Sequence, residues 1–177
     1  MGKHIKILIS GLLISFLGSL PLGTLNTTAF QISASQSISQ AIVFAFAVVL
    51  VELIVVYITL NYASKINFKS KLFSYILPVS IVLLVYLSIS NFMSFDDAQH
   101  ASKSSYVFPL IKSSFLLGLL LSILNPMHVP FWMGWNSILI EKRKLNDKPG
   151  MYPSYISGIG LGTLGSLMIF VFAGKLP

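Results

Sequence analysis

The sequence has 177 residues, of which 55% are hydrophobic and 10% charged, with a mean hydropathy of +0.83. A soluble domain carries about a quarter charged residues, and a chain of this size cannot hide so much apolar surface in one core. The lack of cysteine excludes disulfides, thiol redox relays and thiolate-held metals. The net charge of +7 does not indicate nucleic-acid binding, because basic residues mark the cytoplasmic loops of membrane proteins. The composition therefore predicts an all-α, polytopic membrane protein.

Five apolar segments predict five membrane spans within a single transmembrane domain, residues 1–177. The predicted spans cover residues 5–26, 38–60, 72–92, 113–140 and 154–173. Each is expected to be helical, because a lipid-exposed strand would leave its backbone groups unpaired. The polar stretch 93–112 joins the third and fourth spans and is expected to form an extracytoplasmic loop.

The distribution of lysine and arginine predicts the orientation. With the N-terminus inside, the cytoplasmic segments hold nine basic residues and the outer segments hold three. Cytoplasmic loops carry the excess of positive charge in membrane proteins. We therefore expect a multi-pass protein of the bacterial inner membrane with a cytoplasmic N-terminus.

The first span is interrupted late in its length. It is apolar for 16 residues, from Ile5 to Leu20, which is roughly 24 Å of helix and shorter than the bilayer core of ~30 Å. The sequence then reads Pro21-Leu22-Gly23-Thr24-Leu25-Asn26. Proline removes a backbone donor and glycine weakens the helix further, so a break is expected at this depth.

The fourth span has a matching interruption. Twelve residues from Ser113 to Leu124 are followed by Asn125-Pro126. Broken spans in corresponding positions of two halves are typical of transporters with inverted repeats. Breaks in the first and fourth spans predict a three-plus-three repeat of six helices, with a first repeat 1–92 and an incomplete second repeat 113–177. We expect the sixth helix to have been lost by truncation, with a helix from a partner as the alternative.

Two motifs resemble those of a known family, the LysE/RhtB superfamily of bacterial exporters. The motifs are Ser19-Leu20-Pro21-Leu22-Gly23-Thr24-Leu25-Asn26 in the first span and Gly118 followed by an apolar stretch and Asn125-Pro126 in the fourth. The resemblance covers nearly the whole length of the chain, which is expected to lack the last span of the family. The family usually has Pro-Gly-Pro in the first motif and a lysine after Asn-Pro, where this chain has Met127. These departures bear on the substrate more than on the fold.

The resemblance implies a secondary active transporter that exports amino acids or similar small solutes, driven by the proton gradient. A membrane channel and a non-catalytic membrane assembly protein are the alternatives. An enzyme is not expected, because no nucleophile or metalloprotease motif and no acidic cluster is present. The expected partners are an amino-acid-like solute, protons or another coupling ion, and the lipid bilayer. No cofactor or metal is expected, and homo-oligomerisation stays open.

Glu52 is the one acidic residue inside a predicted span. An ionised carboxylate in the bilayer is costly, so such residues face the protein interior and usually mark an ion or proton path. Glu52 is therefore the candidate for proton or ion coupling, or for pairing with a substrate ammonium. A protonated Glu in a structural hydrogen bond is the alternative.

The remaining candidates for substrate binding lie at the two breaks. Free N–H groups and the positive dipole end of a half-helix suit a substrate carboxylate, and exposed carbonyls suit a cation. Capping of the local backbone is the alternative for the asparagines and threonines, and packing or interfacial anchoring is the alternative for the tryptophan. The candidates are Pro21, Gly23, Thr24, Asn26, Thr27, Asn125, Pro126, His128 and Trp132.

Overall fold

A computed structural model describes residues 2–21, 23–62, 113–125, 127–146 and 149–175. Within these ranges the chain forms six α-helices and no strand, which confirms the all-helical prediction for the described part. The predicted third span, 72–92, and the predicted loop, 93–112, lie outside the described residues. The helices are α1 Lys3–Ser19, α2 Thr24–Ser35, α3 Ile38–Tyr62, α5 Ser114–Ile123, α6 His128–Glu141 and α7 Met151–Ala173.

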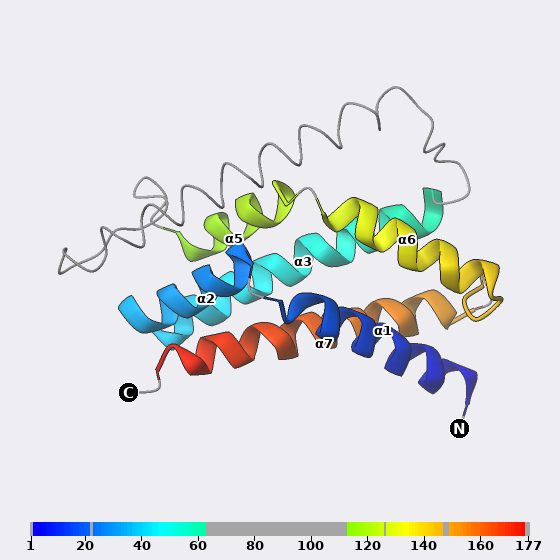
Figure 1. Cartoon of the computed structure of the whole chain (residues 1–177), viewed down its shortest axis with the longest axis horizontal. Helices are drawn as coiled ribbons and strands as arrows, with labels where there is room; N and C mark the ends of the chain where they lie inside the picture. Colours follow the sequence, from blue (N-terminus) through cyan, green and yellow to red (C-terminus); the bar gives the residue numbers. More distant parts are fainter. Residues whose placement is uncertain (1, 22, 63–112, 126, 147–148, 176–177) are drawn as a thin grey trace.

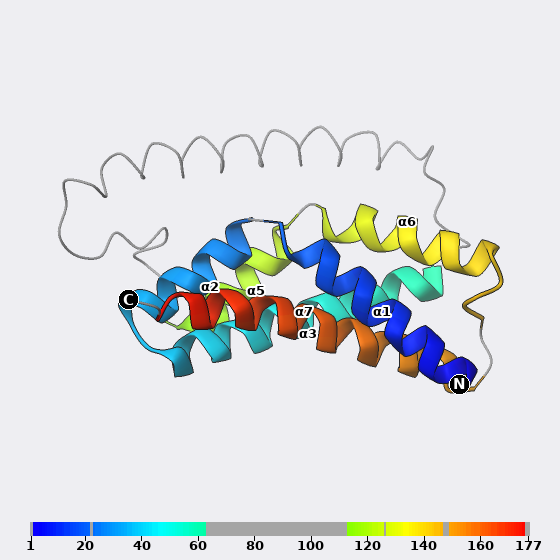
Figure 2. The ribbon, with the colours of Figure 1, turned by 60° about the horizontal axis from the view of Figure 1, so that its bottom comes forward.

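The two long helices, α3 and α7, run along the long axis of the molecule (Figure 1). Helices α1 and α2 follow each other from the end that holds the N-terminus toward the end that holds the C-terminus, and α7 runs beside them in the same sense (Figures 1 and 2). Helix α3 and the pair α5 and α6 run in the opposite sense. Successive described spans therefore cross the molecule in directions that fit a polytopic membrane protein.

The described residues contain two continuous spans and two broken ones. Helix α3, over Ile38–Asn61, and helix α7, over Met151–Ala173, are each long and apolar enough to cross a membrane. The pairs α1 with α2 and α5 with α6 meet this criterion only together, and they are bent by 77° and 62°. These bends lie where proline and glycine predicted breaks in the first and fourth spans.

The first break follows from local backbone chemistry. Helix α1 ends at Ser19, two residues before Pro21, because proline offers no N–H to continue the helical hydrogen bonds. Helix α2 begins after Gly23, whose backbone is extended with φ −136° and ψ 174°. The chain therefore leaves one helix and enters the next within a few residues.

The structure extends two of the predicted spans. The first span was expected to end at Asn26, but α2 continues to Ser35. Residues 27–35 contain no proline or glycine, and Ala29 and Ile32 on one face of this segment are buried in the core, so the helix has no reason to stop earlier. Helix α7 begins at Met151 rather than at 154, because Pro153 is tolerated in the first turn, where backbone N–H groups have no partner in the helix.

Two apolar clusters fill the interior. One joins α2, α3, α5 and α7, and the other joins α1, α3, α6 and α7. Helices α3 and α7 contribute to both clusters and therefore form the centre of the molecule. The large apolar side chains that stay exposed, such as Leu17, Tyr57 and Phe172, lie on the outside, as expected for surfaces in contact with lipid.

Helices α1 and α7 approach each other with backbone in contact. A Cβ built on Gly158 would lie 2.1 Å from the carbonyl oxygen of Leu8, and one built on Gly162 would lie 2.4 Å from that of Leu12. Only glycine permits such an approach, as in other closely packed membrane helices. Gly158 and Gly162, four residues apart on α7, therefore form a packing surface for α1.

Candidate functional site

Glu52 lies inside the bundle, where three other helices meet α3. Its side chain is buried, with 4% exposed. The indole Nε1–H of Trp132, on α6, donates to Glu52 Oε1 at 3.1 Å. The hydroxyl of Thr163, on α7, donates to Glu52 Oε2. A second hydroxyl, that of Ser15 on α1, hydrogen-bonds Thr163. One buried polar chain therefore connects Ser15, Thr163, Glu52 and Trp132.

The partners of Glu52 are neutral. No ion pair within the described ranges involves its carboxylate, and both oxygens are satisfied by uncharged donors. A buried ionised carboxylate without a cation partner is costly. The arrangement therefore suits a group that takes up a proton, or that receives a cation from outside the protein.

The polar chain reaches both broken spans close to their breaks. Ser15 lies in the last turn and a half of α1, which ends at Ser19. Trp132 lies one turn into α6, which begins at His128. Glu52 is therefore tied to the end of one half-helix and to the start of another, so that a displacement of either half-helix changes its surroundings.

Trp132 is a core residue rather than an interfacial anchor. Its side chain has 0% exposed and packs edge-on against Phe131 and Tyr155, with ring centroids 5.0 Å and 6.4 Å away. Trp135, three residues later, is 37% exposed. Trp132 therefore packs in the core, as one of the alternatives predicted, and also hydrogen-bonds Glu52.

The asparagine of the first break closes the end of α1. Asn26 is buried, and its Nδ2 donates to the carbonyl oxygens of Ser19 at 2.6 Å and Pro21 at 2.9 Å. Thr27, by contrast, is exposed and donates back to its own helix, to the carbonyl oxygens of Gly23 and Thr24. At this break Asn26 therefore satisfies carbonyl groups at the end of α1, whereas Thr27 bonds only carbonyl groups at the start of its own helix.

The start of α2 carries the other candidates of the first break. Pro21 and Gly23 are exposed and Thr24 is half-buried. Gly23 is the N-cap of α2, and no side chain caps the amides of the first turn. Those amides are available to an acceptor from outside the helix.

The second break is held by Asn125 in a similar way. Its Oδ1 accepts from the backbone N–H of Met127 at 3.1 Å, and its carbonyl accepts from the N–H of His128 at 3.3 Å. Pro126 lies outside the described residues. Asn125 therefore prepares the turn into α6.

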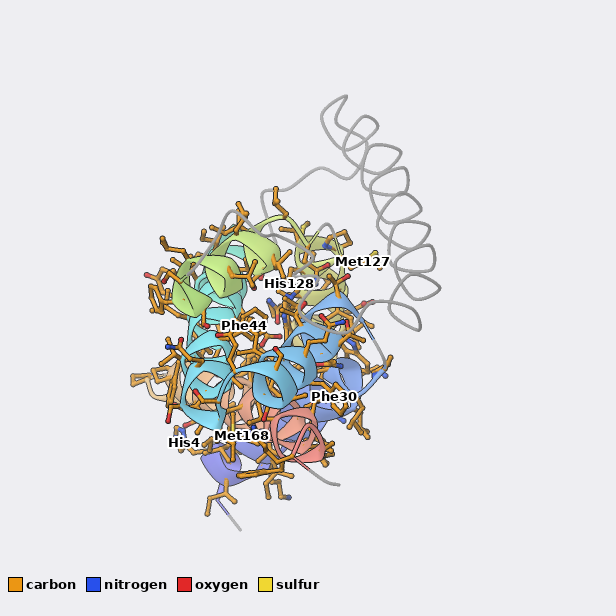
Figure 3. All side chains as sticks on the ribbon, turned by 90° about the vertical axis from the view of Figure 1, so that its left-hand side faces the viewer. His4, Phe30, Phe44, Met127, His128 and Met168 are labelled. Atoms are coloured by element: carbon orange, nitrogen blue, oxygen red, sulfur yellow. The ribbon has the colours of Figure 1, made fainter. Side chains whose placement is uncertain are left out.

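His128 opens α6 and points inward. Its Nδ1 is buried without a hydrogen-bond partner in the described part of the chain. Met127 beside it is 52% exposed, and Figure 3 shows His128 nearer the middle of the bundle than Met127. His128 thus presents one unused nitrogen inside the protein.

The two breaks lie next to each other in space. A Cβ built on Gly18, near the end of α1, would lie 2.6 Å from Cζ of Phe131 in the first turn of α6. The same neighbourhood is visible in Figures 1 and 2, where the end of α1 lies close to the start of α6. The structure therefore brings the two breaks close together, with Asn26, Glu52 and Trp132 buried and Pro21, Gly23 and Thr27 exposed.

Two residues of the polar chain escaped the sequence analysis. Neither Ser15 nor Thr163 is among the candidates that the sequence singled out. Their signal is a hydroxyl at a buried position of an otherwise apolar helix, which has to find a hydrogen-bond partner. No group of three or more His, Asp or Glu side chains that could hold a metal ion occurs among the described residues.

The sequence matches one known protein family. The model of the family described as LysE type translocator matches residues 6–174, which includes both broken spans and Glu52. No curated protein and no solved structure matches the chain. The extent of the family match confirms the resemblance seen in the two Pro/Gly motifs. The chain belongs to the LysE type translocator family and is a membrane transporter.

Proposed function

We propose that this protein is a secondary active transporter that exports an amino-acid-like solute in exchange for protons. The observation that carries the proposal is Glu52, a buried carboxylate without a cation partner in the described residues, which hydrogen-bonds to α6 and connects through Thr163 to α1. A proton that binds or leaves Glu52 changes the bonding of both broken spans. This is the connection that a proton-driven transporter requires between its coupling group and its moving parts.

The solute is proposed to bind between the two breaks. The uncapped first turn of α2 offers amide N–H groups, which suit a carboxylate. Glu52, when ionised, suits the ammonium of the same solute. His128 Nδ1, buried without a partner among the described residues, is a further hydrogen-bonding group for the solute. A zwitterion carries the two charges that such a site would recognise.

The arrangement of helices supports an inverted repeat. Helices α1 and α5, the first halves of the broken spans, run in opposite senses along the long axis, and so do α3 and α7 (Figure 1). Helix α1 packs tightly on α7, and α5 packs tightly on α3. An inverted repeat that equates α1 with α5 and α3 with α7 requires both of these pairings.

The charge distribution supports a cytoplasmic N-terminus in the inner membrane. His4 lies beside Gly150, because a Cβ built on Gly150 would lie 3.0 Å from the His4 ring. The N-terminus and the connection between α6 and α7 therefore share one end, while the C-terminus lies at the other (Figure 1). The shared end carries Lys3, Lys6, Lys142, Arg143 and Lys144, as expected for the cytoplasmic side.

The test is an efflux screen in cells that overproduce the protein and are loaded with isotopically labelled amino acids. Export of one or a few of them, abolished by an uncoupler, supports the proposal. Flux that survives the uncoupler identifies a passive channel instead. Loss of all uncoupler-sensitive export in Glu52→Gln assigns the coupling to this carboxylate, whereas wild-type export in that variant excludes it.

A further inference from the structure

The first halves of the two broken spans make the same packing contact. A Cβ built on Gly11, in α1, would lie 2.5 Å from the carbonyl oxygen of Tyr155 and 3.0 Å from its ring Cδ2. One built on Gly118, in α5, would lie 2.7 Å from the carbonyl oxygen of Phe44 and 3.3 Å from its ring Cδ2. The contact of α1 with α7 at Gly11 therefore matches the contact of α5 with α3 at Gly118.

This equivalence relates Glu52 to Thr163. Tyr155 follows Phe44 by 111 residues, and Thr163 follows Glu52 by the same 111 residues. A twofold axis exchanges equivalent positions of two inverted repeats, so equivalent residues that touch each other lie beside that axis. Glu52 and Thr163 hydrogen-bond directly. They form a pair at the centre of the repeat, placed alike toward both broken spans.

The serines of the two broken spans are equivalent by position but not by bonding. Ser122 follows Gly118 by four residues, as Ser15 follows Gly11. Ser15 hydrogen-bonds Thr163 and so joins the central pair. Ser122 donates instead to the carbonyl oxygen of Val48 at 3.4 Å, one turn before Glu52. That distance is at the long end for a hydrogen bond, so Ser122 is weakly held.

We infer that Ser15 and Ser122 hydrogen-bond the Glu52–Thr163 pair in turn: one serine does so when the transporter opens to one side of the membrane, and the other when it opens to the opposite side. The inference rests on the proposed function and its inverted repeat. When such repeats rock against each other, each takes up the arrangement that its counterpart has left. In the opposite state Ser122 bonds Glu52, and Ser15 donates to the carbonyl of Ile159, the equivalent of Val48.

The exchange makes the two serines act in opposite directions. Ser15→Ala removes the Thr163 bond of the described state, and Ser122→Ala removes the expected Glu52 bond of the opposite state. In its other state each serine loses only a weaker bond to a backbone carbonyl, such as the 3.4 Å bond of Ser122 to Val48. A net hydrogen bond changes the ratio of two states by about five-fold. Ser122→Ala is therefore expected to hold α1 more firmly against α7, although Ser122 lies on α5 and its bond is to α3. A serine with a purely local role has no such effect.

The experiment is hydrogen–deuterium exchange of the full chain in lipid nanodiscs, without solute. Ser15→Ala is expected to speed amide exchange along α1 about five-fold, Ser122→Ala to slow it about five-fold, and the double variant to restore the wild-type rate. Ser33→Ala is the matched control, because Ser33 is fully buried and has no hydrogen-bond partner among the described residues. It is expected to leave α1 unchanged.

Unchanged or faster exchange along α1 in Ser122→Ala overturns the inference. If that variant does not fold, Ser122→Cys replaces it, since a thiol keeps the shape and donates only weakly. Thr163→Val removes the shared hydroxyl and is expected to abolish the effect of the Ser122 substitution, while Thr163→Ser keeps it. Persistence of the effect in Thr163→Val also overturns the inference. Because no solute is present, these results are independent of whether the efflux screen finds an amino-acid substrate.

Discussion

Two substitutions at Glu52 are expected to separate its chemistry from its structural role. In Glu52→Gln the amide oxygen still accepts from Trp132 Nε1–H, and the new NH₂ group donates to Thr163, whose hydroxyl can accept as well as donate. Every hydrogen bond of the polar chain is kept, but no proton is exchanged. We therefore expect a stable protein that has lost uncoupler-sensitive efflux.

In Glu52→Leu the apolar side chain has a similar volume but accepts nothing. The indole N–H of Trp132, whose side chain has 0% exposed, loses its partner. A buried unpaired donor costs about 1–3 kcal/mol, whereas the Thr163 hydroxyl retains Ser15 as its partner. The free energy of unfolding is thus expected to fall by about 1–3 kcal/mol in Glu52→Leu and to stay close to wild type in Glu52→Gln.

The assay is unfolding by sodium dodecyl sulfate in mixed micelles, followed by circular dichroism, together with efflux from cells that carry equal amounts of each variant. Equal destabilisation of Glu52→Gln and Glu52→Leu would show that the Glu52 carboxylate has a bonding role that an amide cannot fill. Uncoupler-sensitive efflux by Glu52→Gln would refute the assignment of this carboxylate to proton coupling.

Four further substitutions address packing and hydrogen bonding through the same unfolding assay. Gly158→Ala is expected to destabilise the protein by about 1–3 kcal/mol, because its Cβ would lie 2.1 Å from the Leu8 carbonyl oxygen. Gly134→Ala is the control: a Cβ there would have nothing within 4 Å, so the protein is expected to be stabilised by up to about 1 kcal/mol. Similar effects of the two substitutions would contradict the close approach of α1 and α7. Asn26→Leu removes both hydrogen bonds that close α1 and is expected to cost about 1–3 kcal/mol, and an unchanged unfolding midpoint would argue against its capping role. Tyr155→Phe removes a buried hydroxyl that has no partner in the described residues, so stability is expected to hold or to rise by up to about 1 kcal/mol; a clear loss would reveal a partner for that hydroxyl.

The breaks of the first and fourth spans could be predicted from the sequence because their cause is local. A proline at residue 21 removes a donor wherever the helix lies, and α1 ends before it. The extent of α2 beyond Asn26 was not predicted, because nothing in the local sequence says that Ala29 and Ile32 find a core to pack against. Residues 72–92, the predicted third span, lie outside the described ranges.

The interior position of Glu52 also followed from the sequence, since a carboxylate cannot face lipid cheaply. The hydrogen-bond partners of Glu52 could not be predicted from the sequence. Trp132 and Thr163 come from positions 80 and 111 residues away, and their register against α3 is set by the packing of whole helices. Thr163 stands beside Gly162 in a stripe of small residues, and its hydroxyl becomes informative only once the close approach of α1 and α7 places Ser15 within reach.

The amide of Asn26 also determines how the first span can move. Because it donates to the carbonyl oxygens of both Ser19 and Pro21, it fixes the turn between α1 and α2, and the angle between these half-helices does not depend on a bound solute. Gly23, the extended residue between α1 and α2, lies inside the segment that these two hydrogen bonds close, so the two half-helices are expected to move as one unit. An arriving molecule then meets a shape already formed, and little of its affinity is consumed in ordering the backbone.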